Sequence, residues 1–196
     1  MRKVIITMMV LIIALSSITV AASFSDIAGH WAEEYIIKLA DTNVISGYPD
    51  GTYKPNNTLT YGEYFKLIVT ASLPDVDFSQ LDNSTGHWAG AYLTVLENYD
   101  IVEKGTITKE KLNTKISRVE VVRVLSECDI KIRGNAQRTA TLDFTDIDNI
   151  SSMEKTLLKH AVATEVINGD PEGTFRPTGE LRRSEVAKII ATYTDK

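Results

Sequence analysis

The sequence contains a single cysteine, Cys128, in 196 residues. An internal disulfide and a cysteine-ligated metal cluster are therefore excluded, and the fold must be stabilised by its apolar core. A buried, unreactive thiol is the expected state of Cys128. Positive charge is also scarce: 21 Lys and Arg face 26 Asp and Glu, for a formal net charge of −5. Bulk electrostatic binding of nucleic acid or of an anionic membrane surface is not expected, so any anionic ligand must be held locally.

Proline is scarce (5 residues), no low-complexity tract is present, and the chain is 43% hydrophobic and 24% charged, as is typical of a folded domain. A long apolar run occurs at the N-terminus, where Arg2 and Lys3 precede apolar residues 4–15 and small residues 20–22. This pattern predicts a secretory signal peptide over residues 1–22. A membrane anchor is the alternative, but the run is shorter than the roughly 20 residues that span a bilayer.

What the sequence does contain is an internal repeat. The segment SGYPDGTYKP at 46–55 returns as NGDPEGTFRP at 168–177, a shift of 122 positions (168−46). The tripeptide His-Trp-Ala at 30–32 recurs at 87–89, a shift of 57 (87−30), and the same shift relates Glu63 to Glu120. Three units therefore fill the chain after the signal peptide, with a polar linker before the third. The predicted boundaries are 1–22 for the signal peptide, 23–75, 76–130 and 142–196 for the units, and 131–141 for the linker.

Each unit predicts two helices. In the first unit, an apolar stripe over about 30–43 indicates an amphipathic helix, which we expect to end at a left-handed Gly47. A second helix begins at Thr60 and is apolar nearly all round, which places it at the centre of the molecule. Thr60 and Ser117 are expected to form capping boxes with the glutamates three residues later, whereas Arg182 leaves the third unit without a cap side chain. The sequence thus predicts an all-α fold, mainly helical, with three tandem helix-loop-helix repeats packed around a shared axis.

These motifs carry a family resemblance. Phe24-x-Asp26, His30-Trp31-Ala32, the turn at 45–53 and the glutamate near the start of each second helix resemble the S-layer homology (SLH) motif, whose second helix begins with isoleucine, threonine, arginine, alanine and glutamate. Three tandem motifs would cover the chain after residue 22. The resemblance implies one pseudo-threefold, spindle-like domain that is secreted and attaches proteins to the bacterial cell wall or S-layer, with no cofactor and no metal.

The ligand that the resemblance implies is a secondary cell-wall polysaccharide bearing pyruvate ketals, bound in the grooves between motifs. Arg118 and Arg183 stand at the motif's arginine position, where a guanidinium can hold a carboxylate bidentately and a lysine cannot. Six further positions are implied as sugar contacts, through flat aromatic faces, carboxylate acceptors and close backbone approach: Trp31, Trp88, Asp26, Asp146, Gly47 and Gly169.

Several of these residues have a structural alternative. Trp31 and Trp88 fall on the apolar stripes and fit core packing as well as sugar contact. Asp26 and Asp146 fit the capping of a following segment equally well. The sequence also departs from the motif, with Tyr61 at the arginine position of the first unit and Met153 at the tryptophan position of the third. At most two of three grooves therefore carry the expected chemistry.

Two other classes of function were weighed. An enzyme is not expected, because His30, His87 and His160 pair with no nucleophile in a recognisable motif and the three repeats use the whole chain after the signal. An envelope assembly protein, whose grooves bind a protein partner instead of a polysaccharide, is the alternative function.

Overall fold

The computed structural model describes residues 24–81, 83 and 85–196, and the predicted signal peptide lies outside these residues. The described part of the chain is helical, without a β-strand beyond three isolated bridges, so the all-α prediction is confirmed. The elements, in chain order, are α1 (Glu33–Asp41), α2 (Tyr61–Ser72), the 3-10 helix η1 (Phe78–Gln80), α3 (Gly90–Asn98), α4 (Lys109–Leu112), α5 (Arg118–Lys131), α6 (Ser152–Ala163) and α7 (Arg183–Thr194). No helix among these residues has the length and apolar character needed to cross a membrane.

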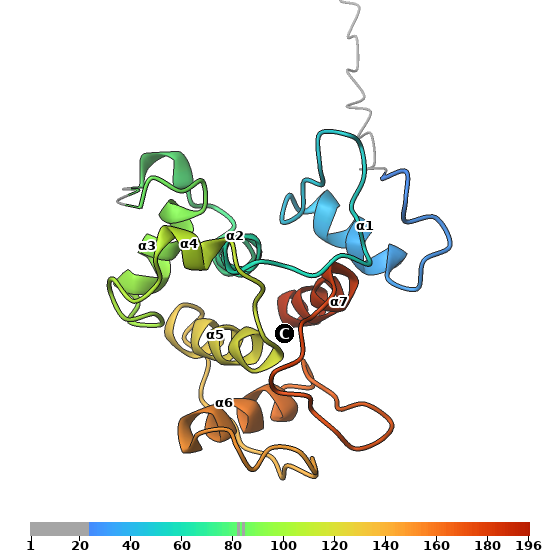
Figure 1. Ribbon diagram of the computed structural model, residues 1–196, viewed down its shortest axis with the longest axis vertical. Helices are drawn as coiled ribbons and strands as arrows, with labels where there is room; N and C mark the ends of the chain where they lie inside the picture. Colours follow the sequence, from blue (N-terminus) through green and yellow to red (C-terminus); the bar gives the residue numbers. More distant parts are fainter. Residues whose placement is uncertain (1–23, 82, 84) are drawn as a thin grey trace, which may run out of the picture.

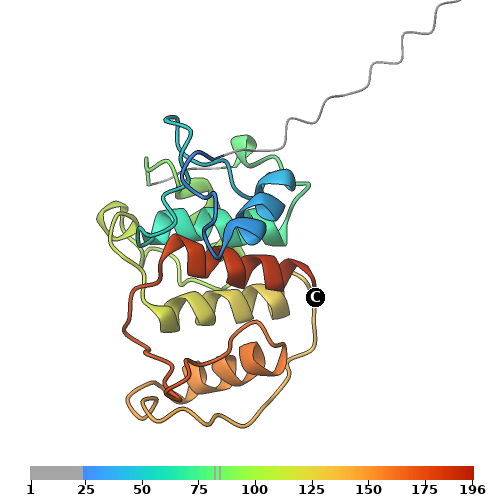
Figure 2. The same ribbon diagram turned by 90° about the vertical axis from the view of Figure 1, so that its right-hand side faces the viewer.

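Three inner helices, α2, α5 and α7, form the centre, and the outer helices α1, α3 and α6 surround them as three lobes (Figure 1). Each outer helix packs on the inner helix of the preceding unit: α3 on α2, α6 on α5, and α1 on α7. The contact between α1 and α7 joins the two ends of the chain and closes the ring. Figure 2 shows α7 and α5 from the side, one above the other.

The inner helices are buried nearly all round, as predicted, and their tyrosines use their polar tips to join neighbours. The Tyr64 hydroxyl of α2 donates to the carbonyl oxygen of Val121 in α5 over 2.7 Å. The Tyr193 hydroxyl of α7 lies 2.8 Å from the Ser72 hydroxyl of α2. Both rings are almost fully buried. These bonds satisfy hydroxyls that would otherwise be costly to bury, and they tie α2 to both other inner helices.

The segments before the inner helices interlock. Residues 61, 118 and 183, the first of each inner helix, donate their backbone N–H to a carbonyl of another unit: Tyr61 to Thr114 (3.0 Å), Arg118 to Gly179 (2.8 Å) and Arg183 to Asn57 (2.7 Å). Three isolated bridges run beside these bonds. The residue at the motif's arginine position is therefore fixed by a neighbouring unit in all three cases.

The helix ends differ from two predictions. The outer helices end at left-handed residues that occupy one register position, Asn43 (φ 60°), Asp100 (φ 54°) and Glu165 (φ 59°), and not at Gly47. Asn and Asp accept this backbone conformation more readily than most residues. The capping box at Thr60 is confirmed, but the Ser117 side chain makes no cap hydrogen bond. Glu120, its expected partner, is bonded to an arginine one turn later instead.

The linker contains no regular element after α5 ends, as predicted, but it is fastened to the third unit. The backbone N–H of Arg138 donates to Nδ1 of the buried His160 (3.0 Å), whose Nε2 lies 3.0 Å from Asp129. Cys128 is fully buried, which raises the pKa of its thiol and agrees with an unreactive state.

Candidate functional site

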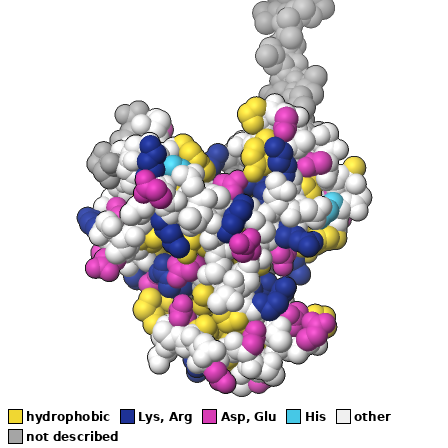
Figure 3. Space-filling model, in the orientation of Figure 1, with side chains coloured by type: hydrophobic (Ala, Val, Ile, Leu, Met, Phe, Trp, Pro, Cys, Tyr) yellow, Lys and Arg dark blue, Asp and Glu magenta, His cyan; other side chains and the backbone are white. Residues whose placement is uncertain are grey.

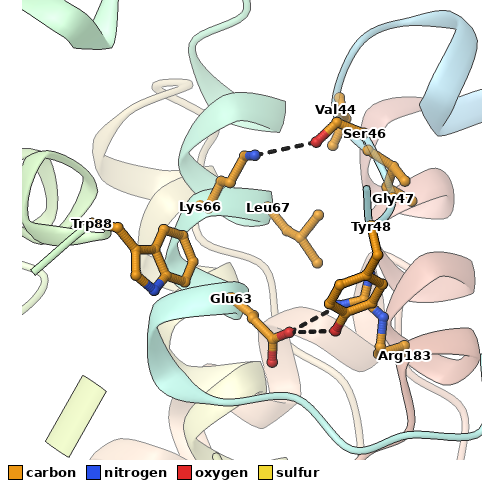
Figure 4. Close-up of a pocket in the computed structure, with 10 residues that line it drawn as sticks. Val44, Ser46, Gly47, Tyr48, Glu63, Lys66, Leu67, Trp88 and Arg183 are labelled. Carbon is orange, nitrogen blue, oxygen red and sulfur yellow. Dashed lines mark hydrogen bonds and ion pairs between the residues drawn. The ribbon is translucent and has the colours of Figure 1, made fainter. Parts of the chain in front are cut away.

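Two related cavities lie where three units meet. The first groove, of about 170 Å³, is lined by the 44–48 loop of the first unit, Glu63, Lys66 and Leu67 of α2, Trp88 of the second unit and Arg183 of the third. In Figure 4, Trp88 lies on one side of this groove and the 44–48 loop on the other, with the α2 side chains between them. Each unit thus contributes one wall.

Arg183 is held firmly at the base of the first groove. Its Nε donates to the carbonyl oxygen of Tyr53 over 2.8 Å, and its Nη1 lies 3.2 Å from Oε1 of Glu63. The guanidinium lies over the rings of Tyr53 and Tyr48, at 4.5 and 4.8 Å from their centroids. The Tyr48 hydroxyl donates to the same Glu63 oxygen (2.8 Å). The arginine is therefore buried, paired and stacked before any ligand arrives.

The pKa of Glu63 reflects these contacts. Burial would raise the pKa of this carboxyl. The hydrogen bonds from the Thr60 backbone N–H and the Tyr48 hydroxyl, together with the Arg183 charge, lower the pKa by more, so it lies below its usual value. Glu63 is thus a carboxylate that orients an arginine. We find no reason to place it against an anionic ligand.

The second groove is built in the same way, with its loop, glutamate and lysine shifted by 122 positions from those of the first groove. It has a volume of about 330 Å³ and is lined by residues 165–169 of the third unit, Glu185, Lys188, Ile189 and Thr192 of α7, Trp31 of the first unit and Arg118 of the second. Because Trp31 comes from the first unit, this groove depends on the packing of α1 against α7. The loop and the inner helix that line this groove contribute residues at the same register as the 44–48 loop and α2 do in the first groove.

Arg118 is held more loosely than Arg183. Its Nη1 lies 3.8 Å from Glu185, its Nη2 lies 3.4 Å from the carbonyl oxygen of Asn168, and its buried Nε has no hydrogen-bond partner among the described residues. Asp170 replaces the stacking tyrosine of the first groove and faces Arg176 instead (3.4 Å). Burial lowers the pKa of the Arg118 guanidinium, the direction expected of a cation whose desolvation is incompletely compensated.

The two tryptophans face solvent and not the core. Trp31 is 57% exposed and Trp88 is 56% exposed, although each flanks a buried alanine. The reason is local: α1 begins at Glu33 and α3 at Gly90, so both tryptophans precede the helices whose stripes they were expected to extend. Each indole stacks at a tilt on the preceding histidine, with centroids 5.6 and 5.3 Å apart. Two flat apolar faces are thus presented at the groove mouths.

The two aspartates bond to backbone within their own units. Asp26 accepts from the N–H groups of Tyr53 (2.8 Å) and Lys54 (2.7 Å). Asp146 accepts from the equivalent residues Phe175 (2.8 Å) and Arg176 (2.7 Å). Both carboxylates therefore brace the turn after the glycine loop, and their contact with a ligand stays a prediction.

The two glycines are required by a close approach. A Cβ on Gly47 would lie 2.3 Å from the ring of Phe24, and one on Gly169 would lie 2.4 Å from the ring of Phe144. Of the two, only Gly47 has the expected positive φ (63°). The glycine loops are thus positioned by the phenylalanine of each unit's first motif.

At the third junction, where α5 of the second unit stands in the place of α2 and α7, the groove residues are replaced. Arg123 stands where the grooves have Lys66 and Lys188, and it is occupied by Glu120 (3.2 Å) and Glu127 (2.7 Å). Met153, at the tryptophan position, is 54% exposed. Lys104 stands where the grooves have Gly47 and Gly169, and the short helix α4 occupies the register of the turn that follows the glycine loop. Figure 3 shows basic and acidic side chains interspersed over the face that is seen in Figure 1.

Sequence reasoning missed the two groove lysines. Lys66 reaches the Ser46 hydroxyl at 3.3 Å, whereas Lys188 has no polar side-chain partner within the described residues. Their register, 188−66 = 122, is the same shift that related the glycine loops, so the repeat itself carried the signal. The described residues contain no group of three His, Cys, Asp or Glu suited to a metal ion.

Comparison with known proteins gives relatives of several kinds. The chain is 29% identical over 179 residues to the S-layer protein EA1 of Bacillus anthracis, covering 89% of this chain and 20% of that protein. It is 26% identical over 178 residues to an amylopullulanase of Thermoanaerobacterium thermosulfurigenes, covering 89% of this chain and 10% of that protein. A segment of 45 residues is 53% identical to cell surface glycoprotein 1 of Acetivibrio thermocellus, covering 23% of this chain and 2% of that protein. The chain thus spans a small part of these relatives.

The family comparison agrees with the two grooves. Residues 23–65 and 143–187 match the S-layer homology domain family. These segments contain both glycine loops, both groove glutamates, Trp31 and Arg183, whereas the middle unit, which supplies Trp88 and Arg118, lies outside them. A third motif in the middle unit stays a prediction. The match to the S-layer homology domain family thus covers most of the first and third units, and the loops of these two units line the two grooves.

Proposed function

We propose that this chain is a non-covalent anchoring module that holds a protein at the cell wall by binding a pyruvylated secondary cell-wall polysaccharide in its two grooves. The observation that carries the proposal is the recurrence, in both grooves, of an arginine that is buried (Arg183) or half-buried (Arg118), a glycine loop, a lysine and an exposed tryptophan, drawn from three units.

The relatives support the anchoring half of the proposal. Their names include S-layer proteins, an amylopullulanase, an exoglucanase and an endoglucanase, and this chain aligns with 10 to 20% of each. A short segment shared by proteins of such different named activities suits attachment better than catalysis. Attachment of this kind would place the chain at the cell wall or S-layer.

The groove chemistry supports an acidic sugar as ligand. The Nε of Arg118 has no partner among the described residues, and its Nη1 lies 3.8 Å from the Glu185 carboxylate. A ligand carboxylate would therefore supply the hydrogen bonds that this guanidinium lacks. Lys66 and Lys188 add a second cation at each groove. A pyruvate ketal presents one planar carboxylate on a sugar ring, which matches a cation beside a flat indole face.

The test is binding of purified, pyruvylated wall polysaccharide to residues 23–196. Trp31→Ala and Trp88→Ala should each weaken binding at one groove, and the double variant should lose it, because each removes an exposed ligand face with little effect on packing. Met153→Ala is the matched control, since Met153 has the same register and a similar exposure. It should bind as the parent does.

Two outcomes would contradict the proposal. If the polysaccharide binds equally well after chemical removal of pyruvate, the carboxylate has no role. If the double tryptophan variant still sediments with intact cell walls while it no longer binds the purified polymer, a protein partner in the envelope is the better explanation.

A further inference from the structure

A second cavity adjoins the second groove at Trp31 and Glu185. This side pocket is lined by Trp31, Thr58, Arg176, Glu180, Arg182, Ser184 and Glu185. Trp31 and Glu185 line both the side pocket and the second groove. A ligand that extends past Trp31 from the groove would therefore enter the side pocket.

Ser184 gives the side pocket an unused polar group. Ser184 is only 1% exposed, and its hydroxyl oxygen is buried without a hydrogen-bond partner among the described residues. A buried hydroxyl left unpaired costs about 1 to 3 kcal/mol, so native proteins rarely retain one without a use. Here the hydroxyl belongs to a residue that lines a cavity open to a ligand.

The charged side chains of the side pocket are also available. Arg182 and Glu180 are exposed, and neither forms an ion pair with any described residue. Arg176 is 59% exposed on its side chain and makes only long contacts, at 3.4 Å to Asp170 and 3.9 Å to Glu185. The pocket therefore offers a hydroxyl, a free carboxylate and a free guanidinium beside an indole face. This mixture fits a sugar ring with hydroxyl and acetamido groups, because such a ring both donates and accepts hydrogen bonds.

The residues at the equivalent positions beside the first groove are different. The positions equivalent to Ser184 and Arg182 (shifted by 122) are Gly62 and Thr60. Gly62 has no side chain, and a Cβ there would lie 3.1 Å from Ala89 and 3.2 Å from His87. The Thr60 hydroxyl is already engaged in its capping box with Glu63. The polar groups of the side pocket are thus specific to the third unit.

We infer that the second groove and the side pocket form one site for two consecutive sugar residues, whereas the first groove holds a single residue. This inference rests on the proposed function. The acidic sugar lies at Arg118, Trp31 lies between the two residues, and the neighbouring sugar contacts Ser184, Arg182 and Glu180. The two grooves then differ in what they select: the first accepts a terminal residue, and the second also recognises the residue linked to it.

The experiment compares two probes, a pyruvate-ketal monosaccharide and the disaccharide in which that residue is linked to one further N-acetylhexosamine. Calorimetric titration is performed on residues 23–196 carrying Trp88→Ala, which leaves the second groove, and on residues 23–196 carrying Trp31→Ala, which leaves the first. With Trp88→Ala the disaccharide should bind about tenfold tighter than the monosaccharide, the gain expected from one or two added hydrogen bonds to charged groups. With Trp31→Ala the two probes should bind equally.

Two added substitutions assign the gain to the side pocket. Ser184→Ala and Arg182→Thr, each in the Trp88→Ala background, should remove most of the tenfold gain and leave monosaccharide affinity unchanged. Neither should destabilise the fold: Ser184→Ala removes an unsatisfied hydroxyl, and Arg182→Thr introduces a cap residue at the start of α7. If the tenfold preference for the disaccharide is lost while the melting temperature is unchanged or higher, unfolding does not explain the loss.

The outcomes separate the two hypotheses. If neither groove binds the pyruvylated monosaccharide, the proposed function fails. If the monosaccharide binds but the disaccharide gains nothing with Trp88→Ala, or if the gain survives both Ser184→Ala and Arg182→Thr, the two-residue site is wrong and the proposed function stands.

Discussion

Arg183 and Arg118 occupy the same register position, yet their replacement by alanine should have different effects on stability. Arg183→Ala removes a 2.8 Å bond to the Tyr53 carbonyl and a 3.2 Å pair with Glu63, and it removes a cation from between two tyrosine rings. Breaking a buried pair by deleting one partner costs about 3 to 5 kcal/mol. Glu63 keeps its bonds to Tyr48 and Thr60, so we expect the lower end, about 3 kcal/mol.

Arg118→Ala should cost less. Its closest polar contacts are 3.4 and 3.8 Å, and its removal also removes a buried donor without a partner. We expect about 1 kcal/mol. For a domain of this size each 1 kcal/mol lowers the melting temperature by about 2 to 4 °C, so the two variants should differ by about 4 to 8 °C.

Differential scanning calorimetry of residues 23–196, with urea unfolding as a second measure, tests this difference. A double-mutant cycle of Arg183→Ala with Glu63→Gln should give a coupling free energy above about 1 kcal/mol. Equal melting of the two arginine variants would refute the reasoning, because it would mean that the hydrogen-bond geometry around Arg183 has no energetic consequence.

Three further predictions follow from the same contacts. Gly47→Ala should destabilise more than Gly169→Ala by about 1 kcal/mol in urea unfolding, because only Gly47 adds a positive φ to the clash with its phenylalanine. Gly105→Ala should cost only the strain of its positive φ (77°), about 1 kcal/mol, because a Cβ there would meet no atom within 4 Å. The pKa of Glu63 is lowered on folding, so its contribution to stability is present above its unfolded pKa and is lost as pH falls through the folded value; Glu63→Gln should flatten the pH dependence of the urea midpoint below about pH 5. A chain ending at Lys131 loses α7, on which α1 packs, and should show no cooperative thermal transition.

The sequence predicted the architecture well because the repeat is strong at positions that the fold reuses. Apolar periodicity identified the inner helices, and the shift of 122 placed both glycine loops in equivalent grooves. The capping box at Thr60 was predictable from two residues alone. These are features that depend on local sequence or on repetition.

Other features of the site were not predictable. Trp31 fell on an apolar stripe, and its exposure is set by where α1 begins, a boundary that periodicity does not fix to the residue. The backbone partners of Asp26 lie 27 and 28 residues away, and a single sequence does not show which distant residues meet. Ser184 follows an arginine at the start of a helix, and nothing in its neighbours along the chain indicates that its hydroxyl is left without a partner.

Tyr61 provides a last prediction about the combination of units that lacks a groove. It stands at the register of the two groove arginines, its ring lies edge-on to Phe65 at 5.9 Å, and the Lys111 ammonium lies 4.5 Å from its centroid. The glutamate that an arginine here would need, Glu120, is already bonded through both oxygens to Arg123. Tyr61→Arg would therefore place a second guanidinium beside a satisfied carboxylate and next to a lysine, at a cost of about 1 to 2 kcal/mol.

Adding Met153→Trp to Tyr61→Arg should not create a third site either, because residues 101–105, at the register of the glycine loop, have Lys104 in place of Gly47 and Gly169. We expect titration with a pyruvate-ketal monosaccharide to give the same number of sites for this double variant as for the parent chain. Tyr61→Phe serves as the control and should leave both melting and binding unchanged, since the Tyr61 hydroxyl has no hydrogen bond among the described residues. An additional binding site in the double variant would mean that the arginine and the tryptophan suffice for binding, and that the glycine loop is not required to form a groove.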